Sequence, residues 1–406
     1  MAITNEKEQG LFSRMMPAGL VGLGHGATHW VAAVFLFCLP FLSEETGIGI
    51  VEAGFLASVF HIASFLANLG SGPVVDMTGR RVLWQVVSLT IGAAGLVVFA
   101  FSPALWLAVL AVSAIGASNN LWHPAAISYL SQRYPGRRGL ALSIHALGAN
   151  LGDAVAPLVL GLVIAVFGWR ESASISVIVP VLTALALLFF LKRTSAGGAV
   201  SASEGKAGKA DFLAGLKSLV GNRAVLAMCL MSGFRNLAQA GLLVFLPFYL
   251  LREIGFSVWA AGAAMFAFQI CGMVAAPVAG HLSDRIGRRP VVMAGLSLST
   301  LVLAGLSFVE SGPVFVAGIS VLGFALFAIR PVVHSWLMDI APSHMGGSAT
   351  SLMFGVQSLL AMIAPVAGGW LADQYGLIAA FYFLGAGMLV ANAMVFALPK
   401  QDSVKG

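Results

Sequence analysis

Long apolar runs alternate with short polar segments along almost the whole chain. Each run holds about 20 residues or more, the length at which an α-helix crosses a hydrocarbon core of about 30 Å. Twelve such runs can be counted, at roughly 15–42, 52–72, 81–101, 104–130, 139–167, 171–191, 223–251, 258–282, 290–309, 313–338, 346–372 and 377–398. The pattern predicts an all-α membrane protein with twelve transmembrane helices.

The longest polar break separates the first six runs from the last six. Residues 192–222 are rich in Gly, Ser and Ala, carry scattered Lys and Glu, and end in a short amphipathic stretch near 212–220. Such a composition is typical of a flexible linker. We therefore expect an N-terminal six-helix bundle at 1–191, a cytoplasmic linker at 192–222 and a C-terminal six-helix bundle at 223–406.

Composition and charge place the protein in a membrane. Of its 406 residues 59% are hydrophobic and 9% are charged, whereas a soluble chain carries about 25% charged residues. With the N-terminus in the cytoplasm, 18 of the 22 Lys and Arg fall in inner segments, two in outer loops and two inside spans. The positive-inside rule then predicts a multi-pass protein of a bacterial-type inner membrane, with both termini cytoplasmic. Because the basic residues flank the apolar runs, the net charge of +6 indicates no nucleic-acid partner.

A ten-residue motif occurs twice, at an offset of 208 residues. The two copies are 72–81 and 280–289, and each holds an acid, a glycine and paired arginines between two spans. We expect a charge latch at the membrane surface, with Asp76 paired to Arg80 and Asp284 paired to Arg285. The candidate gating residues are Gly72, Asp76, Gly79, Arg80, Gly280, Asp284, Arg285, Gly287 and Arg288. The alternative is a positive-inside loop that only orients the chain.

Prolines repeat at nearly the same offset. The pairs are Pro40 with Pro247, Pro124 with Pro331, Pro135 with Pro342 and Pro157 with Pro365. Two six-span halves with equal topology indicate parallel repeats about an axis along the membrane normal. The duplicated motif resembles the signature of the major facilitator superfamily, and the similarity extends over all twelve spans. This resemblance implies two pseudo-symmetric bundles in which spans 1, 4, 7 and 10 line a central cavity.

Further motifs resemble the fosmidomycin-resistance-type exporters. They are Gly24-His25, Trp122-His123-Pro124, Arg138-Gly139-Leu-Ala141 and Gly148-Ala-Asn150-Leu-Gly152. A Gly/Pro motif similar to that of the superfamily's antiporters occurs at 152–161 and again at 364–369. The resemblance implies export of a small compound. The chain departs from the exporter pattern at Trp122 and Ala125, where a phenylalanine and an acid are usual, and at Thr28-His29, where an acid is usual.

Polar residues in spans 1, 4, 7 and 10 occur in pairs four residues apart, so each pair shares a helix face. These substrate-binding candidates are His25, His29, Asn119, His123, Arg235, Gln239, Arg330 and His334. Two arginines inside the hydrocarbon favour an anionic substrate, which a guanidinium binds through two parallel hydrogen bonds. The alternative is that such residues only join helices by hydrogen bonds.

Asp153 is the only acid that lies well inside a predicted span. An ionisable group there costs about 2.5–3.5 kcal/mol on insertion scales and therefore indicates a function. Histidine gains and loses a proton near neutral pH. The proton-coupling candidates are Asp153, His25, His29 and His123. The arginine of the superfamily's antiporters is missing from span 4, so the coupling scheme stays open.

Metal transport is a minor alternative. His25 and His29 can ligate a transition metal from adjacent turns, but neither an acid nor a cysteine accompanies them on that face. Cys38, Cys229 and Cys271 lie in apolar runs without Cys-x-x-Cys spacing. We therefore expect no metal site, no disulfide framework and no cofactor.

These observations predict a secondary active transporter that moves a small organic solute, anionic or amphipathic, by alternating access and proton-coupled efflux. Proton-coupled uptake of a small organic anion and a transport-dead receptor or assembly factor are the alternatives. A membrane enzyme is not expected, because the loops are too short to hold a catalytic set. The expected partners are the substrate, protons and the lipid bilayer, and the expected state is a monomer.

Overall fold

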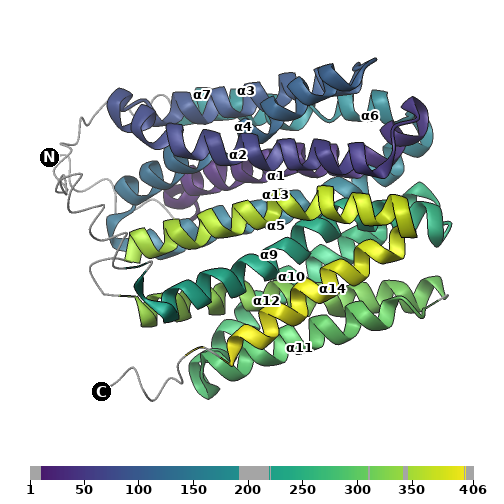
Figure 1. The fold of residues 1–406 in the computed structure, drawn as a ribbon. Helices are drawn as coiled ribbons and strands as arrows, with labels where there is room; N and C mark the ends of the chain where they lie inside the picture. Colours follow the sequence, from purple (N-terminus) through teal and green to yellow (C-terminus); the bar gives the residue numbers. More distant parts are fainter. Residues whose placement is uncertain are drawn as a thin grey trace, which may run out of the picture. The chain divides into compact units, whose positions relative to one another are not determined.

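The computed structural model describes residues 11–191, 219, 221–309, 311–341, 346–396 and 398, with the backbone only at 11–14 and 346–348. These residues form helices and no strand (Figure 1). Within them, twelve segments are long and apolar enough to cross a membrane. The predicted all-α fold with twelve spans is therefore confirmed.

The first six spans are formed by seven helices and a short turn. Their bounds are α1 (Leu11–Thr46), α2 (Ile50–Thr78), α3 (Arg81–Ala100), α4 (Leu105–Arg133), the 3-10 turn η1 (Pro135–Arg137), α5 (Arg138–Phe167), α6 (Trp169–Ile175) and α7 (Ile178–Leu191). Helices α6 and α7 together make the sixth span, Trp169–Leu191.

The last six spans begin after the segment that was expected to be a linker, most of which lies outside the described residues. Their helices are α9 (Arg223–Phe248) with the π-helical turn η2 (Tyr249–Glu253), α10 (Val258–Ile286), α11 (Arg288–Leu306), α12 (Gly312–Ile340), α13 (Gly346–Tyr375) and α14 (Leu377–Val395). Side-chain caps start two of them, since Asn222 accepts from the backbone N–H groups of Ala224 and Val225, and Ser257 accepts from that of Ala260. Such caps satisfy N–H groups that the first helical turn leaves without partners.

The glycines at helix ends show the internal repeat directly. Among the described residues, six glycines have a positive φ angle and no other residue does. They form three pairs separated by 208 residues, namely Gly47 with Gly255, Gly79 with Gly287 and Gly168 with Gly376. Because side chains disfavour this left-handed conformation, each glycine sets a helix end at the corresponding place in both halves.

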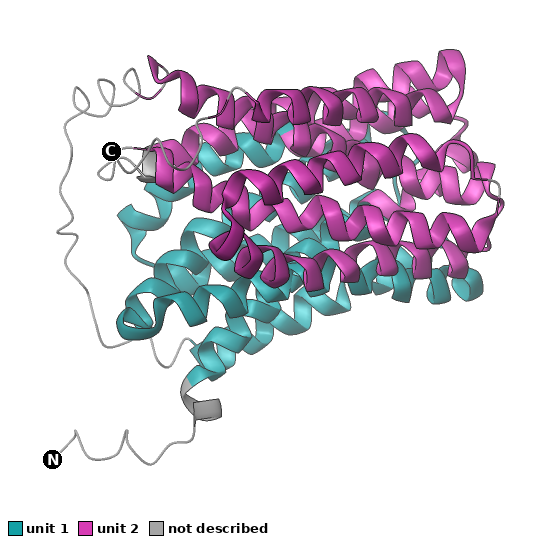
Figure 2. Ribbon diagram, turned by 90° about the horizontal axis from the view of Figure 1, so that it is seen from below, with its two compact units in different colours: residues 1–35, 62–200 teal, residues 36–61, 201–406 magenta. Residues whose placement is uncertain are grey.

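The chain clusters into two compact units, coloured separately in Figure 2. Unit 1 comprises residues 1–35 and 62–200, and unit 2 comprises residues 36–61 and 201–406. The C-terminal part of α1 and the start of α2 therefore group with unit 2. The bundle boundaries given above stay a prediction.

Residues 36–61 are held within unit 2 by polar contacts. The Ser58 hydroxyl donates to the Met362 carbonyl at 2.6 Å, and Arg252 donates to the Ser43 hydroxyl at 3.0 Å. The backbone N–H of Ile50, at the start of α2, donates to Asp373 at 3.2 Å. These bonds tie the ends of α1 and α2 to α13 and to the turn that follows α9.

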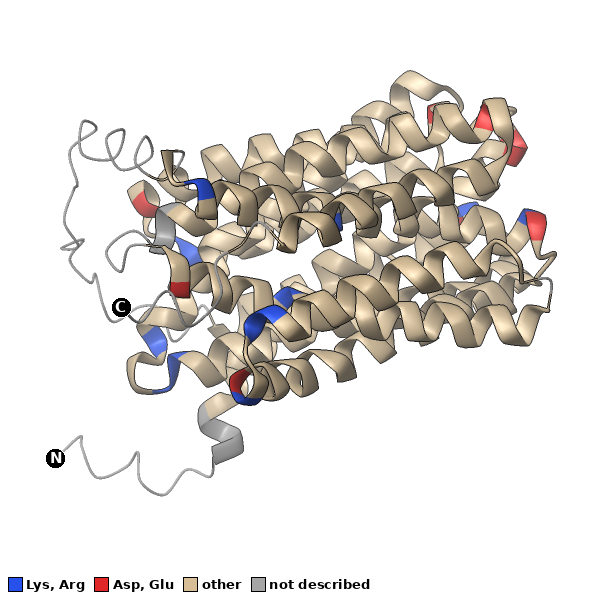
Figure 3. Ribbon diagram, turned by 60° about the horizontal axis from the view of Figure 1, so that its bottom comes forward, with Lys and Arg blue, Asp and Glu red and all other residues tan. Residues whose placement is uncertain are grey.

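Charged residues gather toward the helix ends, and the stretches between them are almost free of charge (Figure 3). This distribution is expected for helices in hydrocarbon, where each charge is costly and backbone groups are satisfied within the helix. The few charged residues away from the ends therefore mark the parts of the fold where a function is to be sought.

Helices α1 and α5 approach closely in unit 1 because both carry glycines one turn apart. A Cβ atom at Gly148 would meet the backbone carbonyl of Gly22, and a Cβ atom at Gly152 would meet that of Gly26. Small residues spaced four apart let transmembrane helices pack backbone to backbone. This crossing brings the polar residues beside the glycines of α1 within bonding distance of those on α5.

Candidate functional site

The α1–α5 crossing places a histidine against the intramembrane acid. His29 Nδ1 lies 2.9 Å from Asp153 Oδ2. The two side chains are 23% and 27% exposed, so each retains some access to its surroundings. Sequence reasoning proposed both residues as proton-coupling candidates without placing them together, and the structure brings them into direct contact.

His25, one turn before His29, is held by the backbone of α5. Its Nδ1 lies 2.7 Å from the carbonyl oxygen of His145. A carbonyl only accepts, so Nδ1 carries the hydrogen and a neutral His25 has its lone pair on Nε2. That Nε2 atom is buried and has no hydrogen-bond partner among the described residues.

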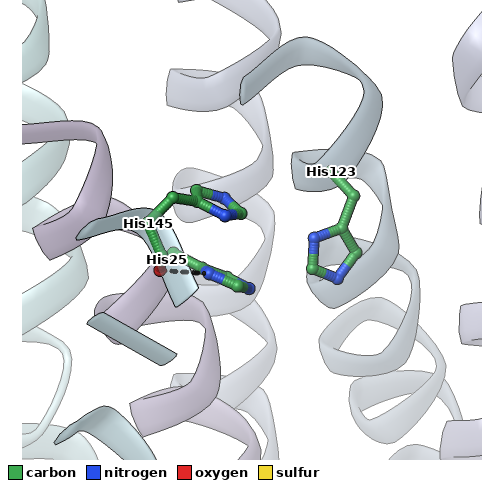
Figure 4. Close-up of side chains that lie close together, drawn as sticks. All are labelled: His25, His123 and His145. Atoms are coloured by element: carbon green, nitrogen blue, oxygen red, sulfur yellow. Dashed lines mark hydrogen bonds between the residues drawn. The ribbon is translucent and has the colours of Figure 1, made fainter. Parts of the chain in front are cut away.

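His145, which was not among the predicted site residues, completes a cluster of imidazoles with His25 and His123. Its ring stacks on that of His25, with centroids 3.8 Å apart and an interplanar angle of 14°. The indole N–H of Trp122 donates to His145 Nε2 at 3.1 Å. Figure 4 shows the stacked rings of His25 and His145 both directed toward His123, whose ring centroid is 4.9 Å from that of His25.

The signal that could have found His145 is the glycine spacing of the two spans. Gly22 and Gly26 in α1, and Gly148 and Gly152 in α5, are both small-residue pairs four apart. Had the two pairs been matched, the histidine three residues before Gly148 would have fallen beside α1. Asn119, the remaining candidate in this unit, is half-buried on α4, and its side chain has no hydrogen bond to a residue that the structure describes.

Unit 2 holds a buried arginine whose guanidinium is fixed by two bonds. On α9, Arg235 donates through Nη1 to the Leu326 carbonyl of α12 at 3.0 Å, and through Nη2 to Gln239 Oε1 at 2.7 Å. Only 2% of Arg235 is exposed. No carboxylate in the described part of the chain pairs with it, so its charge is oriented by neutral groups alone.

Arg330 and His334 follow on α12, one turn apart. Arg330 is exposed and His334 is half-buried, with the His334 ring centroid 5.2 Å from that of Phe354. In the same unit Gln357 donates to the Ser232 hydroxyl, and Asn236 donates to the Gln357 carbonyl at 3.2 Å. These last three residues join α9 to α13, which is the helix-joining role that was the alternative for such residues.

In the second copy of the duplicated motif, the expected ion pair between Asp284 and Arg285 is wrong. Asp284 forms its ion pair with Arg288, not with Arg285, and Arg288 Nε also lies 3.3 Å from Asp339 Oδ2. Helix α10 continues to Ile286, so the motif is mostly helical rather than a loop, and Gly287 with a φ of 96° redirects the chain so that Arg288 turns back.

The first copy of the motif is arranged differently. Asp76 and Arg80 are both exposed and form no ion pair with each other or with another residue that the structure describes. Arg81 instead donates to the Ser128 hydroxyl at 3.1 Å. Gly79 has a φ of 65° and turns the chain between α2 and α3, whereas a Cβ atom at Gly72 or Gly280 would meet nothing within 4 Å. The positive φ angle thus explains the second glycine of each copy and not the first.

Known proteins are similar to this chain over most of its length. The chain is 25% identical over 389 residues to the Uncharacterized MFS-type transporter YfnC of Bacillus subtilis (strain 168), covering 95% of this chain and 93% of that protein. It is 24% identical over 365 residues to the Fosmidomycin resistance protein of Escherichia coli (strain K12), covering 88% and 86%. Among solved structures, a bacterial homolog of the human lysosomal transporter Spinster in an inward-facing, unoccupied conformation matches with a TM-score of 0.82 at 16% identity, over 96% of this chain and 97% of that one.

The family match covers nearly the whole sequence. The model described as Major Facilitator Superfamily matches residues 21–272 and 228–405. The two matched ranges together cover the first span from residue 21 onward and the other eleven spans in full. The resemblance drawn from the duplicated motif is therefore confirmed, and the chain belongs to the major facilitator superfamily.

Proposed function

We propose that this transporter couples the movement of a small organic anion to protons by alternating access, and that it exports the anion. The observation that carries the proposal is the contact between His29 and Asp153 at 2.9 Å, inside two transmembrane helices. A carboxylate inside a membrane is costly and therefore rare, and its presence indicates a function. In pumps and transporters, acids and histidines form proton relays. Asp153 is the group on which the coupling rests.

The chemistry of Asp153 supports a role as a proton carrier. In its ionised form the carboxylate accepts from His29, and the contact offsets part of the cost of a charge in a low dielectric. A proton on Asp153 removes the negative charge and weakens the contact. Because both side chains are about one quarter exposed, a proton can reach the carboxyl without unpacking α1 from α5.

Arg235 supports an anionic substrate. A guanidinium has five N–H donors, and the described contacts of Arg235 use donors on Nη1 and Nη2 for Leu326 and Gln239. The two contacts fix the plane of the group, and the remaining donors suit a carboxylate or a phosphonate. Arg330 adds positive charge on α12 of the same unit.

Export is favoured by the relative whose name states resistance to fosmidomycin, since resistance is consistent with removal of a compound from the cell. The excess of basic residues in alternate loops supports an inner-membrane protein with cytoplasmic termini, and we propose that the monomer transports. Proton-coupled uptake of a small anion is the second candidate, because Arg235 serves both directions equally. A transport-dead receptor is less well supported, because such a protein has no need of a protonatable acid inside a span.

Purified protein in liposomes with an imposed pH gradient tests the proposal. Small carboxylates and phosphonates are compared with cationic drugs, and both the direction of flux and the accompanying proton flux are measured. Because export moves the anion and the proton in opposite directions, we expect an anion to accumulate on the acidic side, which the protons leave. This accumulation should collapse when the pH gradient is dissipated. Gradient-driven movement of a cation only, or anion flux that ignores the gradient, would contradict the proposal.

A further inference from the structure

We propose that His25, His123 and His145 form a binding site for a divalent transition-metal ion of the zinc class. The three residues come from α1, α4 and α5 of unit 1, and one nitrogen of each lies within 4.8 Å of one nitrogen of each of the others. Neither the family match nor the named relatives assign a metal to this chain, and the sequence raised metal ligation only as a minor alternative, through His25 and His29. The metal proposal does not use the contact between His29 and Asp153 on which the transport proposal rests.

His25 is set up as a ligand. Its Nδ1 hydrogen is engaged by the His145 carbonyl at 2.7 Å, which leaves the lone pair of Nε2 free. Metal-binding histidines usually donate the other ring nitrogen to a carbonyl or carboxylate, because this fixes both the tautomer and the direction of the lone pair. His25 is only 6% exposed, and its Nε2 has no partner among the described residues. A ligand at this atom accounts for a buried acceptor that is otherwise unsatisfied.

His123 and His145 supply the second and third nitrogens. Figure 4 shows the rings of His25 and His145 side by side and directed toward His123. A neutral imidazole has one lone pair, and His123 would bind the metal ion through the nitrogen that carries it. A neutral His145 has one lone pair, which accepts from the Trp122 indole at 3.1 Å. Ligation by His145 therefore exchanges that hydrogen bond for a metal bond.

Metal binding requires the rings of His25 and His145 to tilt relative to each other, because a metal ion lies in the plane of each imidazole that binds it and the two planes are now nearly parallel, at 14°. Zn–N bonds of about 2.0–2.1 Å in a tetrahedral site place the ligand nitrogens roughly 3.4 Å apart. Rotation of the rings would also have to bring the present nitrogens, which lie within 4.8 Å of one another, to that spacing. The donor set is made of imidazole nitrogens alone, which suits Zn²⁺, Co²⁺, Ni²⁺ or Cu²⁺ and not Mg²⁺ or Ca²⁺, whose ligands are oxygens. Three protein ligands leave a fourth position open to solvent or to another ligand.

Metal titration of the purified full-length protein, with any affinity tag removed, tests the site. Zn²⁺ is followed by calorimetry and Co²⁺ by its visible absorption. We expect saturation at about one ion per chain, in the tetrahedral environment that three imidazoles and one open position give. His25→Gln and His123→Gln should each weaken binding by roughly 10-fold or more, since each removes one ligand. Unchanged affinity in both variants, or no saturable binding to the unaltered protein, would overturn the proposal.

His61→Gln is the matched control, because His61 also lies inside a span but contacts Phe60, with ring centroids 5.2 Å apart, outside the cluster. It should bind the metal like the unaltered protein. A measurement on the unaltered protein removes any dependence on how well the variants fold. X-ray absorption at the zinc edge should show about three imidazole nitrogens at 2.0–2.1 Å. A spectrum dominated by oxygen, or by a single imidazole, would contradict the site.

Discussion

His29 and Asp153 are 124 residues apart in the chain, yet their side chains meet at 2.9 Å. The contact depends on the glycines that let α1 and α5 pack backbone to backbone, with Gly26 one turn from His29 and Gly152 beside Asp153. The close crossing is therefore a condition for the proposed proton site, and disturbing it should disturb both stability and coupling.

Gly148→Ala tests this packing without changing any polar residue. The added methyl group would meet the carbonyl of Gly22 in α1, and a backbone atom cannot move aside as a flexible side chain can. Overpacking of this kind costs about 1–3 kcal/mol, and more where the backbone must shift. We expect a lower thermal unfolding temperature in detergent and a reduced transport rate per folded molecule.

Gly139→Ala is its control on the same helix, because a Cβ atom at Gly139 would meet nothing within 4 Å. It should unfold at the same temperature as the unaltered protein. Equal unfolding temperatures for Gly148→Ala and Gly139→Ala would show that the close α1–α5 crossing is not present in solution.

The spans could be predicted from sequence because the length of an apolar run is a local property. The contact of Arg235 with Gln239 was likewise within reach, since residues four apart share a helix face. Contacts between helices were not, because they depend on how each helix is rotated about its axis. Asp153 was therefore recognised as unusual without its partner His29, and His145 was left out of the site.

The duplicated motif shows a different limit. Its glycine and charges suggested a loop, and a loop leaves the choice of arginine open. Helix α10 extends to Ile286, and the i, i+4 spacing from Asp284 then selects Arg288. An error of a few residues in a helix end is ordinary for sequence patterns, and here it changed the partner of an ion pair.

Arg235 should discriminate anionic substrates. Charge-assisted hydrogen bonds contribute about 1.5–3 kcal/mol, so Arg235→Ala should raise the apparent substrate constant by roughly 10- to 100-fold. Arg235→Lys keeps the charge and loses the planar fork, so we expect a smaller increase. Thermal-shift titration with carboxylates and phosphonates measures both constants.

Arg223→Ala is the control for that series, since Arg223 is exposed at the start of the same helix. It should leave the substrate constant unchanged. If Arg235→Ala lowers the unfolding temperature while binding stays normal, Arg235 only joins α9 to Leu326, and the anionic substrate loses its support.

Because Arg288 contacts both Asp284 and Asp339, substitutions of these two acids should have non-additive effects on stability. Asp284 is 65% exposed in its side chain, so Asp284→Asn alone should cost below about 1 kcal/mol, because Asp339 remains beside the guanidinium. The double variant Asp284→Asn/Asp339→Asn removes both of these carboxylates and should destabilise by more than the sum of the single changes. Unfolding temperatures and turnover rates are measured together. Asp76→Asn, which alters an exposed acid, should leave the unfolding temperature unchanged. If the effect of the double variant equals the sum of the effects of the two single changes, the two acids are not coupled through Arg288.

Counterflow in proteoliposomes made with Asp153→Asn tests the central claim most directly. Asparagine keeps the shape of the side chain and a hydrogen bond to His29 but cannot exchange a proton. We expect the variant to lose accumulation of substrate against its gradient under an imposed pH difference, while exchange of labelled for unlabelled substrate continues at close to the normal rate. Accumulation by Asp153→Asn equal to that of the unaltered protein would show that the coupling proton does not travel through Asp153.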